Sequence, residues 1–203
     1  MRIEQLMIFV KAPRRGTVKT RLARAIGQEA ACGAYQKMVE ELVARLASLS
    51  SVELRFTPDD AVTEIRQWRG RHWQMRPQGE GDLGQRLERA FADAFANGAH
   101  YVAVIGSDCP SITPDDIRAA WASLQTNDVV IGPARDGGYW LIGLREPRPA
   151  LFQTIDWSTN KVLKQTLGRA RARNLKVELL RELSDVDTES DWLEFLDQNR
   201  RLL

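Results

Sequence analysis

Short runs of apolar residues alternate along the chain with longer segments whose apolar residues recur every three or four positions. The short runs predict buried strands, and the longer segments predict amphipathic helices. Strands are predicted over 5–11, 52–57, 73–77, 101–106, 128–132 and 177–180. Helices are predicted over 28–49, 59–68, 83–96, 114–124 and 160–174. Such alternation is typical of an α/β protein in which helices connect parallel strands and cover both faces of the sheet.

One apolar segment breaks this alternation. Residues 139–144 follow the strand at 128–132 after a tight Asp136-Gly137-Gly138 turn that leaves no room for a crossover helix. This segment is expected to pair antiparallel or to lie at an edge of the sheet. No linker, repeat or biased segment interrupts the 203 residues, so the sequence predicts one domain over 1–203. Its expected architecture is a three-layer αβα sandwich around a mostly parallel, mixed sheet.

The composition excludes several classes of partner. With 29 basic and 27 acidic residues, the formal net charge is +2, which is too small for a general nucleic-acid binder. No run approaches the roughly 20 apolar residues that cross a bilayer, so membrane insertion is not expected. The N-terminal residues show no signal-peptide pattern and the two cysteines have no CxxC spacing, which predicts a cytoplasmic protein with reduced thiols. The oligomeric state stays open.

Ligands of open parallel sheets bind beyond the carboxyl ends of the strands, so polar residues that follow strands are the candidates for chemistry. The first strand runs into a loop, residues 11–21, that carries five cations among eleven residues and leads directly into a helical segment. Cationic side chains and the N–H groups at a helix start both favour phosphate. We predict that this loop binds a nucleotide through Lys11, Arg15, Lys19 and Arg21. The alternative is a solvated basic loop, and the spacing is not that of a P-loop.

Acidic residues follow two other strands. Asp108 comes directly after the strand at 101–106, and Asp185 and Asp187 follow the last predicted strand. Carboxylates that converge at one edge of a sheet repel each other unless a cation lies between them, so we predict that Asp108, Asp185 and Asp187 bind Mg²⁺ or Mn²⁺. The alternative role for Asp108 is in a turn or helix cap. Asp191, three residues after Thr188, resembles a capping box, so part of this acidity is structural.

Two glycine-containing loops are predicted to lie on the same rim. In the first, residues 78–87, the glycines allow close backbone approach to a base, and we predict nucleotide contacts from Gln78, Asp82 and Gly84. In the second, we predict an acceptor pocket formed by Asp136, Gly137, Gly138 and Tyr139. The alternatives are a simple glycine-rich connection for the first loop and aromatic packing at a sheet edge for Tyr139 and Trp140.

Six motifs occur in series over nearly the whole chain: FVKAPRRGTVKTRLA, QGEGDLGQRL, VIGSDCPSIT, VVIGPARDGGYWLIGL, DWST and DVDT. In this order they resemble the bacterial family of glycosyltransferase-like or selenodomain-associated transferases. That family belongs to the nucleotide-diphospho-sugar transferase superfamily and is similar to phospholactate guanylyltransferases and molybdenum-cofactor nucleotidyltransferases. The resemblance implies the GT-A fold.

The resemblance also implies roles for individual residues. Lys19 matches the phosphate-loop lysine of the superfamily's nucleotidyltransferases, Asp108 and Asp187 match its two metal ligands, and Gln78 matches a residue that commonly touches the base. The first loop reads KAPRRG in place of the GxGxR form of sugar-phosphate nucleotidyltransferases. The strand at 101–106 is not followed by the Asp-x-Asp of many glycosyltransferases, which favours nucleotidyl transfer.

The predicted function is therefore a Mg²⁺-dependent transfer of a nucleoside monophosphate from a nucleoside triphosphate to a small phosphorylated or carboxylated acceptor, with Lys19 and Asp108 as the catalytic residues. One alternative is glycosyl transfer from a nucleotide-sugar donor, with Asp136 assisting an acceptor hydroxyl. A second alternative is a nucleotide-binding module without catalysis. The donor and the small-molecule acceptor are the expected partners.

Overall fold

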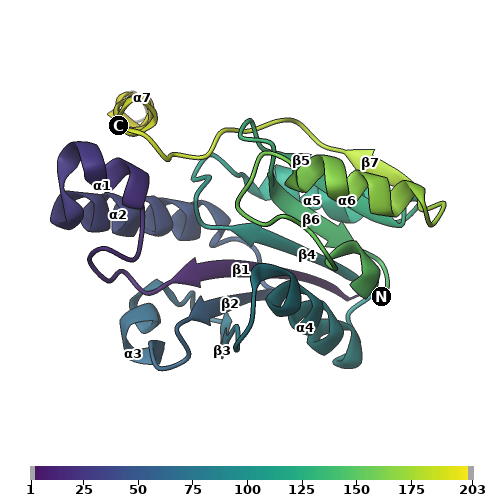
Figure 1. The fold of residues 1–203 in the computed structure, drawn as a ribbon. Helices are drawn as coiled ribbons and strands as arrows, with labels where there is room; N and C mark the ends of the chain where they lie inside the picture. The colour runs from purple at the N-terminus through teal and green to yellow at the C-terminus, as the bar shows by residue number, and fades with distance from the viewer. Residues whose placement is uncertain (1–2, 201–203) are drawn as a thin grey trace.

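The computed structural model describes residues 3–200 and places a seven-stranded mixed sheet between helices (Figure 1). Hydrogen-bonded neighbours follow the order β3-β2-β1-β4-β6-β5-β7, and β6 is antiparallel to both of its neighbours. The strands are β1 (Glu4–Lys11), β2 (Val52–Thr57), β3 (Gln74–Pro77), β4 (Tyr101–Gly106), β5 (Val129–Pro133), β6 (Tyr139–Leu144) and β7 (Val177–Leu179). The α/β class and the mixed, mostly parallel sheet agree with the prediction.

The central strands bury both faces because they lie between two helical layers. In β1, Leu6, Ile8 and Val10 point into one core, and Met7 and Phe9 point into the other. All five side chains are buried. A strand of this kind reads as a continuous apolar run, which is why its position could be predicted without an alternating pattern.

Helices cover each face of the sheet in pairs. Side chains from α2 (Gln28–Leu46) and α5 (Pro114–Ser123) complete one core, and side chains from α4 (Leu83–Ala96) and α6 (Val162–Arg171) complete the other. The three-layer αβα arrangement is therefore confirmed. The shorter elements are α1 (Thr20–Ile26), α3 (Val62–Ile65), η1 (Arg66–Trp68) and η2 (Pro149–Leu151). No helix within residues 3–200 is both long and apolar enough to cross a bilayer.

The last helix, α7 (Glu189–Arg200), lies against the first part of the chain (Figure 1). Trp192 on α7 packs with the buried side chains of Leu22 on α1 and of Ala31 and Ala34 on α2. The segment after β7 therefore crosses the carboxyl ends of the strands before the chain enters α7. This path brings the acidic residues of that segment towards the loop that follows β1.

The structure decides one open expectation and corrects another. The segment 139–144 pairs antiparallel and does not lie at an edge: β6 lies between β4 and β5, and all of its residues after Tyr139 are buried. The strand predicted over 177–180 is present as β7, which pairs with β5 and forms this edge of the sheet. The predicted helix at 59–68 is shorter, because residues 59–61 form a turn before α3 begins.

Gly132 in β5 leaves room for the indole of Trp140. A Cβ at residue 132 would lie 2.2 Å from the Trp140 ring, whose Nε1 donates to Arg181 O at 3.1 Å. We expect Gly132→Ala to lower the free energy of unfolding by about 1–3 kcal/mol, because the buried ring must shift. Urea unfolding measures this, with Gly33→Ala in α2 as the control: no atom lies within 4 Å of its Cβ position, so about 0.5–1 kcal/mol should be gained. Equal effects of both changes would contradict the packing argument.

Candidate functional site

A cleft of about 540 Å³ opens beyond the carboxyl ends of β1 and β4. Its apolar floor comes from both strands, for example from Phe9 and Val104, while its rim is charged. The charged side chains that line it are Lys11, Lys19, Arg21, Arg86, Asp108, Asp185 and Asp187. Because they come from loops far apart in the sequence, the fold concentrates charge of both signs in one cleft.

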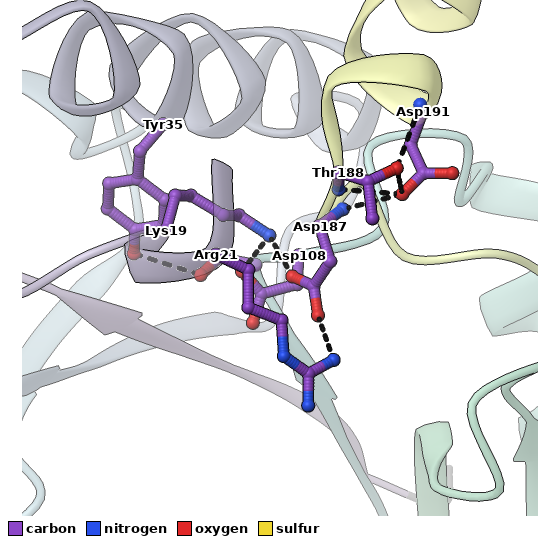
Figure 2. A network of polar contacts seen from close by, with 8 residues as sticks. Lys19, Arg21, Tyr35, Asp108, Asp187, Thr188 and Asp191 are labelled. Atoms are coloured by element: carbon purple, nitrogen blue, oxygen red, sulfur yellow. Dashed lines mark hydrogen bonds and ion pairs between the residues drawn. The ribbon is translucent and has the colours of Figure 1, made fainter. Parts of the chain in front are cut away.

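Lys19 links the two acidic segments (Figure 2). Its Nζ lies 2.6 Å from Asp108 Oδ1 and 3.1 Å from Asp187 Oδ1. The Lys19 side chain is 2% exposed, whereas those of Asp108 and Asp187 are 51% and 35% exposed. Arg21 Nη1 lies 3.6 Å from Asp187 Oδ2. One buried ammonium therefore contacts two of the three carboxylates, Asp108 and Asp187, that the sequence predicted as metal ligands.

Backbone geometry produces this convergence. The N–H of Val186 donates to Asp108 O at 2.9 Å, which docks the chain after β7 beside the chain after β4. The capping box predicted for the next helix is present: Thr188 and Asp191 exchange side-chain and backbone hydrogen bonds and begin α7. Lys19 has φ +47° and ψ +47°, a left-handed conformation at the residue before α1. These three features place Lys19 between the two aspartates.

The environment of Lys19 fixes its charge. Burial alone would lower the pKa of its ammonium, but the neighbouring charges and hydrogen bonds of Asp108 and Asp187 outweigh burial and raise the pKa above the ordinary value of 10.5. Lys19 is therefore a cation throughout the physiological range. Its charge is already opposed by two carboxylates, so it differs from the free phosphate-binding lysine that the sequence predicted.

Asp185 lines the same cleft, and within residues 3–200 its side chain forms no hydrogen bond or ion pair. Burial, followed by the negative charges of Asp108 and Asp136, raises the pKa of its carboxyl to about 7. Lys19 opposes this shift but does not cancel it. The acidic segment therefore contributes Asp187 to the ion-pair cluster. It also places Asp185 in the same cleft, with a raised carboxyl pKa.

The hydroxyl of Tyr35 connects two strand ends beneath this cluster. It accepts from the N–H of Lys11 at 2.8 Å and shares a hydrogen bond with Ser107 Oγ at 2.9 Å. Burial raises the pKa of Tyr35 well above its ordinary value of 10, so the phenol stays protonated. The end of β1 is thereby joined to the residue just before Asp108. Sequence analysis did not predict this role, because the helical pattern of 28–49 indicates only that Tyr35 is a buried core residue of α2.

Tyr35→Phe is expected to lower the free energy of unfolding by about 1–2 kcal/mol, because the N–H of Lys11 loses its partner in a buried place. Ser107→Ala removes one end of the same bridge but leaves Tyr35 to accept from Lys11, so its effect should be smaller. Urea unfolding of both variants measures the difference. An equal or larger loss for Ser107→Ala would contradict the bracing role of Tyr35.

The basic loop divides into two groups. Lys11, Lys19 and Arg21 line the cleft. Arg15 does not line it: its exposed guanidinium lies 2.7 Å from Glu29 Oε1 on α2. The structure therefore does not bring Arg15 to the place where the sequence predicted nucleotide contact, and for this residue the ordinary surface ion pair describes what is seen.

The loop after β3 is held mainly by contacts within the protein. The side-chain amide of Gln78 is buried and donates to Val10 O at 3.2 Å and to Arg55 O at 2.9 Å. Asp82 is the N-cap of α4 and forms a capping box with Gln85. A Cβ at Gly84 would lie 2.6 Å from Phe152 O, so this glycine serves close packing of α4. Gln78 still borders the cleft, but the donors of its amide are engaged.

The predicted acceptor loop shows a similar division. Asp136 Oδ1 accepts from Gly138 N at 2.8 Å, and Gly137 is closely packed, with Asn160 O 2.4 Å from its Cβ position. Both contacts stabilise the turn. Of the four residues predicted for acceptor binding, Tyr139 lines the cleft. Trp140 also contacts the cleft but is buried in the core, although in a central strand and not at an edge.

Cys109 follows Asp108 and is buried. Burial is the largest cause that raises the pKa of its thiol, to about 11, and Ser111 Oγ lies 3.4 Å from Sγ. A thiol that stays protonated at neutral pH is a poor nucleophile. Cys109 therefore packs as a small apolar residue, as its sequence context predicted.

The donor set fits a hard divalent cation. Asp108 and Asp187 both reach the single position of the Lys19 ammonium, so one cation can contact both carboxylates. Mg²⁺ usually takes one or two carboxylates and fills its shell with phosphate and water. No group of three or more His, Cys, Asp or Glu residues converges anywhere in residues 3–200, so a cation here would depend on such additional ligands.

Among the charged residues that line the cleft, Arg86 is the one that sequence analysis left out of the site. It belongs to the QGEGDLGQRL motif and lies on α4, four residues after the N-cap Asp82. Its guanidinium borders the cleft from the side of β2 and β3. A cation in the first turns of a helix opposes the helix dipole, and this unfavourable placement is the signal that could have identified it.

A family model described as "Uncharacterized protein conserved in bacteria (DUF2064)" matches residues 41–159, which is more than half of the chain. The chain belongs to this family. No curated protein matches the sequence significantly. A structure from Desulfovibrio desulfuricans G20, provisionally named a nucleotide-diphospho-sugar transferase, is 33% identical and covers 98% of this chain and 89% of its own, with a TM-score of 0.91. The fold and the family resemblance stated above are thereby confirmed.

More distant structures share the fold. A nucleotidyl transferase from Methanothermobacter thermautotrophicus is 15% identical, with a TM-score of 0.64 and coverage of 98% of this chain and 99% of its own. A CMP:2-keto-3-deoxy-manno-octonic acid synthetase complexed with CTP is 10% identical, with a TM-score of 0.61 and coverage of 99% and 100%. All three proteins are named as transferases or synthetases. Their names agree with the expectation of a transferase that uses nucleotides.

Proposed function

We propose that this chain is a nucleotide-utilising transferase that moves a nucleoside monophosphate from a nucleoside triphosphate to a small acceptor and releases pyrophosphate. The observation that carries the proposal is the junction of Lys19 with Asp108 and Asp187, at 2.6 and 3.1 Å, on a cleft beyond the strand ends. Residues from both ends of the chain meet there, which also supports the prediction of one domain over 1–203.

Asp108 and Asp187 are proposed to hold Mg²⁺ or Mn²⁺. A cation at that place would neutralise the phosphates of the donor and the charge on the departing pyrophosphate. Lys19 keeps the two carboxylates together and supplies a fixed positive charge in a place shielded from solvent. Arg21 is 67% exposed, so its guanidinium is free to turn from Asp187 towards a phosphate oxygen.

In the proposed reaction, an acceptor oxygen bonds to the α-phosphorus while the bond to the bridging oxygen of pyrophosphate breaks in line with it. The acceptor's proton passes to solvent. Such a transfer needs positioned charges more than a side-chain nucleophile. The proposed reaction therefore does not need the thiol of Cys109, which is buried and stays protonated at neutral pH.

Glycosyl transfer from a nucleotide sugar is the second candidate. It is favoured by the name of the 33% identical relative from D. desulfuricans and by the carboxylate of Asp136, whose charge acts on Asp185 in the cleft. In this reaction a nucleoside diphosphate would leave, stabilised by the same charges, and Asp136 would accept a proton from the acceptor hydroxyl.

One assay separates these candidates. The purified protein is incubated with Mg²⁺, with each nucleoside triphosphate or each common nucleotide sugar, and with a mixture of small phosphorylated and carboxylated metabolites. We expect pyrophosphate release with one triphosphate. Release of a nucleoside diphosphate from a nucleotide sugar would replace the first candidate by the second. Nucleotide binding without either product would indicate a binding module and contradict both reactions.

A further inference from the structure

The charges that line the cleft are not evenly paired. Four cations, Lys11, Lys19, Arg21 and Arg86, face three carboxylates. Lys19 and Arg21 form ion pairs with Asp108 and Asp187. Among the ion pairs within residues 3–200, none includes Lys11 or Arg86. The cleft therefore holds an ion-paired cluster and two cations without a carboxylate partner.

The position of these two cations follows from the order of the strands. Lys11 ends β1, and Arg86 approaches Thr57 at the end of β2 and Gln78 just after β3. Asp108 follows β4, on the opposite side of β1. Arg86 and Asp108 thus lie on opposite sides of the β1 end, and Lys11 lies at that end. A ligand that spans the cleft would meet both.

The contacts of the Arg86 guanidinium are weak. Its Nη1 lies 3.4 Å from Thr57 Oγ1 and 3.4 Å from Gln78 Oε1, which is long for a hydrogen bond. Its Nε is buried and has no hydrogen-bond partner. Guanidinium groups removed from water without an anion are costly. The local structure therefore leaves a strong, partly desolvated donor group poorly satisfied.

Two other arginines have stronger partners for their guanidinium groups than Arg86 has. The buried guanidinium of Arg55 forms ion pairs with Glu53 and with Asp93. Arg89, one turn after Arg86 on α4, donates to Gln78 O at 2.6 Å and to Glu80 O at 3.0 Å. Arg86 also lies near the N-terminal end of α4, where the helix dipole disfavours a cation. An anion from outside the chain would resolve both unfavourable features.

We propose that Arg86, together with Lys11, forms an anion-binding position for the phosphate chain of the nucleotide, separate from the Lys19 cluster. This inference rests on the proposed function, because it assigns the phosphate contacts within the same cleft. The planar guanidinium of Arg86 offers two parallel donors to a phosphate, and Lys11 adds a point charge. Lys19 is less suited to that contact, because its side chain is only 2% exposed and two of its three N–H donors face Asp108 and Asp187.

The test measures binding of inorganic pyrophosphate and of each nucleoside triphosphate by calorimetry, with a chelator present so that no divalent cation contributes. Arg86→Gln should weaken pyrophosphate binding roughly tenfold to hundredfold, as expected for the loss of charge-assisted hydrogen bonds. Arg86→Lys should recover part of the loss. Arg118→Gln is the matched control, because Arg118 is exposed on α5, pairs with Asp115 and does not line the cleft.

Thermal unfolding without ligand distinguishes binding from a structural role. If Arg86 serves an anion, Arg86→Gln should be as stable as the unsubstituted protein or more stable, because an unpaired cation is removed. A clear loss of stability together with unchanged pyrophosphate affinity would overturn the proposal, as would an unsubstituted protein that does not bind pyrophosphate. If pyrophosphate binds through Arg86 but no nucleotide or nucleotide sugar is turned over, the proposed transferase fails and the anion position stands.

Discussion

Asp108→Asn is expected to reduce cation-dependent pyrophosphate release by about a hundredfold to a thousandfold, the range seen when one group that stabilises a transition state is lost. Asparagine keeps the shape of the side chain and leaves the backbone contact between Val186 and Asp108 O intact. It removes one of the two negative charges beside Lys19. A divalent cation would then have a single charged ligand, Asp187, and would compete with Lys19 for it.

This prediction is checked by initial rates of pyrophosphate release over a range of Mg²⁺ and Mn²⁺ concentrations, with circular dichroism to show that the variant is folded. Asp115→Asn is the matched control, because Asp115 lies on α5 with its side chain 90% exposed and, within residues 3–200, forms an ion pair only with Arg118. If Asp108→Asn keeps the rate and cation dependence of the unsubstituted protein, Asp108 is not a ligand of the reactive cation.

Lys19→Met is expected to lower the free energy of unfolding and to make stability respond to divalent cations. Methionine keeps much of the volume but leaves Asp108 and Asp187 facing each other without a cation. Breaking a fully buried pair costs about 3–5 kcal/mol. Because both carboxylates are partly exposed, we expect a smaller loss of about 1–3 kcal/mol. Mg²⁺ or Mn²⁺ should restore stability, since it binds the folded state in place of the ammonium.

The pH dependence of this difference has a defined sign. The pKa of Lys19 is raised in the folded protein, so its contribution is fully present below the ordinary value of 10.5 and is lost as the pH rises through the higher folded value. The two proteins should therefore converge in stability above that pH. Urea unfolding with and without Mn²⁺ measures both effects, with the exposed Lys161→Met as control. Equal stability of Lys19→Met and the unsubstituted protein at neutral pH would contradict the ion-pair role.

Helices and strands could be predicted where the pattern of buried apolar residues alone defines their boundaries. The boundaries of β2, β4, β6 and α4 agree residue for residue with the sequence pattern. The position of β6 inside the sheet could not be predicted, because it depends on pairing with β4, whereas the tight turn before β6 indicates only its pairing with β5. Nothing in the local sequence of 139–144 reports that distant pairing.

For the site, the sequence indicated which residues meet but not which atoms touch. Lys19, Asp108 and Asp187 follow strands that end at one edge, and they do lie together. The contact of Lys19 with the carboxylates depends on its left-handed backbone conformation. Lysine rarely adopts this conformation, so the sequence could not predict it. The engaged amide of Gln78 and the poorly satisfied Arg86 likewise depend on side-chain packing between separate loops.

The ion pair of Lys19 with Asp187 joins positions 168 residues apart. During synthesis Lys19 and Asp108 are made early, whereas Asp187 follows only after all seven strands of the sheet. A growing chain that ends before residue 187 lacks one of the two carboxylates that pair with Lys19. We therefore expect the charge cluster to form only once the segment that joins β7 to α7 has been synthesised.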